Sequence, residues 1–213
     1  MRRLGRGVIT IHVGDEEDMQ PFTVHEALIC TRSNFFRNVI SGNSKEAQEK
    51  TVHLPEDDPT IFALYEQLLY SGRLPSESET GAVDDIVKEY ATLCSFYVLS
   101  SKLQDVDAKR VAIDELLGMS RKMMSNGQRM FPLLQHVEII YYGTHGPCAA
   151  RRLMVDIYTH RASEDWLDKM SPPDFIFDLA KNVLRKRHTT HDTTLTCKIS
   201  DYYDTDEVAE EKL

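Results

Sequence analysis

The sequence VHLPEDDPTIFALYEQLLYSG, which runs from Val52 to Gly72, decides the fold of this chain. Its first residues alternate apolar and polar side chains until Pro55, which is the pattern of a short strand. Asp58 followed by Pro59 supplies a helix N-cap and a proline at the first helical position, where the missing N–H has no intrahelical partner to lose. The stretch therefore predicts a strand, a turn and the beginning of a helix.

The predicted helix has one apolar face. Its apolar side chains recur at the helical period of 3.6 residues and are Ile61, Phe62, Tyr65, Leu68 and Leu69. Gly72 stands where a left-handed C-cap would end the helix. We therefore expect one helix, buried along this face, between the proline and the glycine.

Five short sequence motifs that are typical of one known family occur in this chain in the same order as in that family. They are Ile11-His-Val-Gly14, Phe22-Thr-Val-His25, Arg32-Ser-Asn-Phe-Phe36, Leu54-Pro-Glu-Asp-Asp-Pro59 and Leu69-Tyr-Ser-Gly72. With these five motifs the chain resembles the BTB/POZ family, most closely its fungal members, over about residues 8–117. The resemblance implies a protein-interaction module.

The resemblance and the hydrophobic pattern together predict an α/β (α+β) fold of the BTB/POZ type. We expect a small three-stranded sheet with helical hairpins, followed by an all-helical C-terminal extension. The predicted strands are residues 8–13, 22–24 and 52–54. The predicted units are a disordered N-terminus (1–7), the BTB/POZ domain (8–118), the helical extension (119–187) and an acidic disordered tail (188–213).

Apolar periodicity predicts several more helices. One begins at Asp84 and continues to Val98, and the next covers residues 102–117, whereas the charged residues 45–50 are expected to form a loop. Three further apolar stripes follow in the extension. The last of them consists of Phe175, Ile176, Leu179, Ala180, Val183 and Leu184. Because an amphipathic helix does not bury its apolar face alone, the three helices should pack together.

Composition excludes several classes of function. The net charge of −9 argues against a general nucleic-acid binder, and no apolar run reaches the roughly 18 residues that a membrane span needs. The four cysteines, Cys30, Cys94, Cys148 and Cys197, are far apart in the chain, and the basic start is not followed by an apolar run. We therefore expect an intracellular protein, cytoplasmic or nuclear, without nucleic-acid or membrane partners.

No catalytic constellation is evident, so we predict a non-enzymatic protein without cofactor or metal. Cys30 and His25 could share one side of a helix, but a buried cysteine and a helix-start histidine explain the pair better. The carboxylates at 56–58 are better explained by helix capping than by calcium binding. The methionines of residues 119–130 fit either a gap between helical units or an adaptable binding surface.

The resemblance implies two kinds of partner, a second copy of the chain or the cullin scaffold of a ubiquitin ligase. Cullin-binding relatives carry a hydrophobic-x-Glu motif, which falls here on Ser44-Lys45-Glu46 or, in a shifted frame, on Ala47-Gln48-Glu49. Both frames keep the carboxylate but lack a bulky apolar anchor, and such anchors usually dominate interface energy. The candidate contact residues are Arg37, Ile40, Ser44, Glu46, Glu49, Glu66 and Tyr70.

The two ends of the chain also bear on which partner it binds. Only seven residues precede Val8, too few for the extra helix and strand of a strand-exchanged dimer, which we therefore do not expect. The helices of the extension could bind a peptide helix or could only complete the fold, and the sequence leaves both interpretations open.

Overall fold

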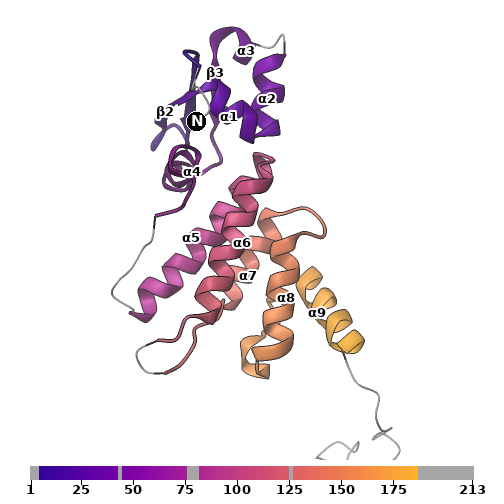
Figure 1. The fold of residues 1–213 in the computed structure, drawn as a ribbon. Helices are drawn as coiled ribbons and strands as arrows, with labels where there is room; N and C mark the ends of the chain where they lie inside the picture. Colours follow the sequence, from indigo (N-terminus) through magenta and orange to yellow (C-terminus); the bar gives the residue numbers. More distant parts are fainter. Residues whose placement is uncertain (1–4, 43–44, 76–81, 125–126, 187–213) are drawn as a thin grey trace, which may run out of the picture.

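The computed structural model describes residues 5–42, 45–75, 82–124 and 127–186. The predicted acidic tail, Ser44 and most of the predicted disordered N-terminus lie outside these residues. Figure 1 shows a small sheet with short helices at one end of the molecule and a layer of longer helices below it. The predicted fold class is confirmed, because a three-stranded sheet is followed by helices to the end of the described chain.

The sheet has the order β2-β1-β3. Strand β1 (Val8–Val13) pairs antiparallel with β2 (Gln20–His25) and parallel with β3 (Thr51–Leu54). In this register Ile11 lies opposite both Phe22 and Val52. Because strand side chains alternate between faces, one face of β1 is buried and the other carries His12, whose ring stacks on that of His53.

Four helices surround the sheet: α1 (Glu26–Arg32), α2 (Asn34–Ser41), α3 (Lys45–Glu49) and α4 (Pro59–Ser71). Helix α4 has the predicted ends, since the Asp58 carboxylate accepts from Thr60 N at 2.7 Å and Gly72 has φ 74°. The predicted loop at residues 45–50 is wrong, because this segment forms α3. An ion pair between Lys45 and Glu49 spans one turn of that helix at 3.7 Å.

Helices α5 (Val83–Lys102) and α6 (Val106–Arg121) form the next pair. The predicted helix over residues 102–117 is therefore wrong at both ends. The backbone of Gln104 has a φ of 55°, which ends α5, and the Asp105 carboxylate then caps α6 by accepting from Ala108 N at 2.9 Å. The boundary predicted after residue 118 falls in the last turn of α6.

The Asp105 carboxylate also joins distant elements. It is 1% exposed, it accepts a hydrogen bond from the Tyr65 hydroxyl of α4 at 3.1 Å, and it forms an ion pair with Arg32 Nε of α1 at 3.1 Å. Burial, and then the neighbouring Asp105 charge, raise the pKa of Tyr65 far above its usual range. One carboxylate thus ties α1, α4 and α6 together.

The extension contains α7 (Leu134–Gly143), α8 (Ala149–Arg161), a 3₁₀ turn, η1 (Glu164–Trp166), and α9 (Pro173–Lys186). Helix α7 packs on α5, and a Cβ added at Gly143 would lie 2.6 Å from both γ carbons of Val98. The Arg151 guanidinium of α8 donates to Tyr141 O at 2.8 Å and to Thr144 Oγ1 at 3.0 Å, which satisfies backbone and side-chain oxygens where α7 ends.

The predicted packing of α9 along its whole apolar stripe is wrong. Phe175 is buried, but Ile176, Val183 and Leu184 are 37%, 45% and 66% exposed. The buried face is instead centred on Phe175 and Asn182, which are seven residues apart and so lie on one line along the helix. Asn182 donates to Asp156 Oδ1 at 3.1 Å and to Thr159 Oγ1 at 2.9 Å. These polar contacts with α8 fix the rotation of α9.

Candidate protein-interaction surface

The first group of candidate contact residues lies on α2. Arg37 donates from Nε to Cys30 O at 3.0 Å and from Nη2 to Thr31 O at 3.4 Å, so its guanidinium binds carbonyls of the last turn of α1. Ile40 is half-buried and packs against the hydrophobic core. The two side chains therefore support the local structure and leave only part of their surface to a partner.

Helix α3 carries the acidic candidates. Glu46 and Glu49 are both exposed and lie three residues apart, so they share one side of the helix. Ala47, the apolar residue of the shifted frame, is half-buried. Helix α3 packs against α2, so the side chains of both helices form one corner of the molecule, which we call the α2–α3 corner (residues 34–42 and 45–49).

The remaining candidates lie on α4. Glu66 is half-buried, and its burial raises the pKa of the carboxyl above the usual range. Tyr70 is 45% exposed, its hydroxyl accepts from His25 N at 3.1 Å, and it lies 2.8 Å from His25 Nδ1. The polar end of Tyr70 is thus engaged at the end of β2, and only the ring is offered to solvent.

The structure does not bring the two groups together. Figure 1 shows α4 beside β2, whereas α2 and α3 lie on the other side of this part of the molecule. Ser44 lies outside the described residues. The candidates therefore form two separate surfaces, one at the α2–α3 corner and one on α4.

The groups considered for catalysis are used structurally. Burial is the main cause that raises the pKa of the Cys30 thiol, which disfavours the reactive thiolate. The His25 ring packs edge-on against Tyr70. Within residues 5–42, 45–75, 82–124 and 127–186, no cluster of three or more His, Cys, Asp or Glu side chains could hold a metal ion. In the same part of the chain, no helix is long and apolar enough to cross a membrane.

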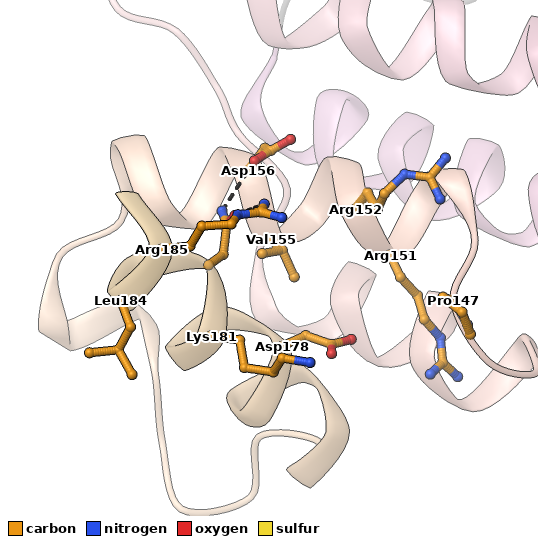
Figure 2. Close-up of a pocket in the computed structure, with 10 residues that line it drawn as sticks. Pro147, Arg151, Arg152, Val155, Asp156, Asp178, Lys181, Leu184 and Arg185 are labelled. Atoms are coloured by element: carbon orange, nitrogen blue, oxygen red, sulfur yellow. Dashed lines mark hydrogen bonds between the residues drawn. The ribbon is translucent and has the colours of Figure 1, made fainter. Parts of the chain in front are cut away.

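Sequence reasoning missed a groove between α8 and α9. Figure 2 shows the side chains that line it, and the charged ones are Arg151, Arg152, Lys181, Arg185, Asp156 and Asp178. The groove has a volume of about 460 Å³. Four cations face two carboxylates, although the whole chain carries a net charge of −9. These residues come together only because α9 folds back on α8.

The short mixed sheet with helices packed around it defines a mixed α/β domain whose exposed surfaces are largely helical. Residues 9–107 match the family model described as the BTB/POZ domain. Residues 9–107 are therefore similar to the BTB/POZ domain, which is a non-catalytic domain that mediates protein–protein interaction. No curated protein matches the chain.

Proposed function

We propose that this protein is an adaptor that connects other proteins to a cullin-type ubiquitin ligase, with the α2–α3 corner as the surface for the cullin. The observation that supports this most directly is the geometry of α3. Residues 45–49 form a helix rather than a loop, and Glu46 and Glu49 are exposed on the same side of it. These are the acidic positions that the resemblance to cullin-binding relatives assigns to the contact.

The apolar part of such a contact would come from α2. Neither Ala47 nor Ser44 has the bulk of an interface anchor, but Ile40 is half-exposed on the neighbouring helix. Arg37 holds its guanidinium against the end of α1, which keeps α2 in place beside α3. The proposal is therefore a contact with a modest apolar centre and a carboxylate rim, and we expect its affinity to fall as salt is added.

The test is binding of the purified chain to a cullin N-terminal domain, measured by calorimetry. Reversing both charges, Glu46→Lys with Glu49→Lys, should weaken binding at least about tenfold, because the rim would then repel the surface that it matches. The control is Glu16→Lys with Glu17→Lys, which makes the same charge change on exposed residues of the β1–β2 loop. Equal binding by the wild-type chain and both variants would remove the α2–α3 corner from the proposal.

The alternative is a self-associating scaffold, for instance in a transcriptional complex, with no role in a ubiquitin ligase. It calls for a concentration-dependent dimer that is insensitive to the charges of α3. The exposed apolar side chains of α9 favour this alternative.

We further propose that the protein acts inside the cell, in the cytoplasm or nucleus, as a BTB protein of the fungal type. The order and residues of its five motifs most resemble those of fungal members of the family. The cysteines of the described chain, Cys30, Cys94 and Cys148, are free thiols, which is typical of reducing compartments. We retain the division into a BTB/POZ domain at 8–118 and an extension at 119–187, joined through the shared packing of α5.

A further inference from the structure

Helix α9 presents an apolar face that nothing in the described chain covers. Figure 1 places α9 at the edge of the molecule, where it packs on α8 and α7. Ile176, Phe177, Val183 and Leu184 are 37% to 66% exposed, and Ala180 between them is exposed as well. At about 100° per residue, these five positions lie within one arc of the helix, turned away from the buried line of Phe175.

This exposed arc is a fixed property of the fold. Asn182 is 4% exposed and bonds to Asp156 and Thr159 of α8, and Lys186 Nζ lies 2.7 Å from Asp156 Oδ1. Rotating α9 to bury Val183 and Leu184 would break these contacts and turn the buried Phe175 toward solvent, which is unfavourable. The helix is therefore held with its apolar arc toward solvent.

The arc is self-complementary in an antiparallel arrangement. If Ala180 lies on a two-fold axis, Ile176 of one copy lies level with Leu184 of the other, and Phe177 lies level with Val183, because each pair is symmetric about residue 180. The small side chain of Ala180 lies at the crossing point, where it lets two helices approach closely. A large side chain would thus meet a smaller or more flexible one at each level.

The charges beside the arc have the same symmetry. Asp174, at the start of α9, has an exposed side chain, and its contact with Arg151 Nη1 is long, at 3.9 Å. Lys181 and Arg185 lie on the same flank of the helix as Asp174, toward its other end. In the antiparallel arrangement, Asp174 of one copy faces Arg185 and Lys181 of the other. A parallel two-fold arrangement would instead place the two charged flanks on opposite sides of the helix pair, where the opposite charges do not meet.

We propose that α9 is a self-association surface and that its occupant is α9 of a second copy of this chain, packed antiparallel about Ala180. The inference is separate from the cullin-facing role of the α2–α3 corner and uses none of its residues. A single helix pair buries less than the roughly 1,600 Å² of a standard interface, so the dimer is weak and depends on concentration. It would make the adaptor bivalent when the chain is locally concentrated.

The test is disulfide crosslinking of the full chain under mild oxidation, with a cysteine placed at the proposed axis. Ala180→Cys should give a covalent dimer in clear excess over the wild-type chain, whose own cysteines set the background. Tyr142→Cys is the control, since Tyr142 is also exposed but lies on α7, outside the proposed interface. Adding Phe177→Glu and Leu184→Glu to Ala180→Cys should abolish the crosslink, and circular dichroism checks that these exposed changes leave the fold intact.

A charge exchange tests the direction of the helices. With Ala180→Cys as the reporter, Asp174→Arg should reduce crosslinking several-fold, and Asp174→Arg combined with Arg185→Asp should restore it.

Crosslinking of Ala180→Cys no stronger than that of Tyr142→Cys would overturn the proposal. A second result would also overturn the proposal. If the chain binds anionic lipid vesicles and the Phe177→Glu, Leu184→Glu variant does not, the apolar face binds a membrane surface and not a second copy. Because charge reversal on α3 leaves α9 intact, failure of the cullin contact and failure of this dimer are separate results.

Discussion

Helices α4 and α9 share a sequence pattern but have different surroundings. Each begins at a proline and carries apolar side chains at helical spacing. Helix α4 buries all five of its predicted apolar side chains, whereas α9 buries Phe175 and leaves Ile176, Val183 and Leu184 exposed. The comparison shows that periodicity reveals an apolar arc, whereas the rotation of the helix depends on which polar groups the neighbouring element offers.

The largest effect should come from removing one aromatic ring from each helix. Phe62→Ala in α4 deletes a fully buried ring and should lower the free energy of unfolding by about 3–5 kcal/mol. Phe177→Ala in α9 removes a ring that is 62% exposed and should change it by no more than about 0.5 kcal/mol. Urea titration followed by circular dichroism measures both. Similar losses in the two variants would mean that α9 is covered in the isolated protein.

The second largest effect should come from removing Asp105, the buried carboxylate that binds Tyr65 of α4. Asp105→Ala removes the buried partner of Tyr65 and Arg32 together with the cap of α6, and should lower the free energy of unfolding by about 3 kcal/mol. Asp107→Ala is the matched control, because Asp107 is exposed and its contact with Arg32 Nε is long, at 3.9 Å. We expect a change within about 0.5 kcal/mol for this control in the same titration. An Asp105 variant as stable as the control would show that the carboxylate does not join the helices.

A smaller and local effect is expected for the polar contact of α9. Asn182→Ala leaves Thr159 and Asp156 with fewer partners and should weaken α9 by about 1–2 kcal/mol. Hydrogen exchange should then speed up in the amides of α9 while those of α4 keep their protection. If protection falls equally in both helices, the extension and the BTB/POZ domain unfold as one unit.

The smallest effect should appear on acidification. The hydrogen bond from Lys186 is the main cause that holds the pKa of Asp156 below its usual value. Its ionised form therefore stabilises α9 above the unfolded pKa of about 3.9, and this contribution is lost as the pH falls through the lower folded value. Hydrogen exchange between pH 5 and pH 3 should show α9 loosening before α4. In Asp156→Asn this extra loosening should disappear; if it persists, another carboxyl is responsible.

The sequence predicts the BTB/POZ part well because its signals are local. The cap at Asp58, the glycine at the end of α4 and the alternation in β1 each act within a few residues. The start of α6 was misplaced for the opposite reason. Asp105 is fixed there by Arg32 and Tyr65, which are distant in the sequence and reach it only in the folded chain.

The candidate surfaces show the same limit. The exposed carboxylates of α3 could be selected from the sequence, but their separation from Glu66 and Tyr70 depends on where α4 packs. Tyr70 contacts His25, 45 residues away in the sequence, so its hydroxyl is engaged at the end of β2. The α8–α9 groove and the exposure of the apolar arc of α9 were not predictable, because both depend on the contacts of Asn182 with α8.

Helix α5 packs against α4, α6 and α7 at once, and Gly143 of α7 lies in close contact with Val98 near its C-terminal end. This shared packing matters for anyone who would shorten the chain. A fragment ending at residue 107, where the family match ends, would keep α5 but remove most of α6 and all of α7. Side chains of α5 left bare, such as Tyr90, whose ring packs against His136 of α7, would favour aggregation over a soluble minimal domain. In practical terms, the unit to express is the chain through α9.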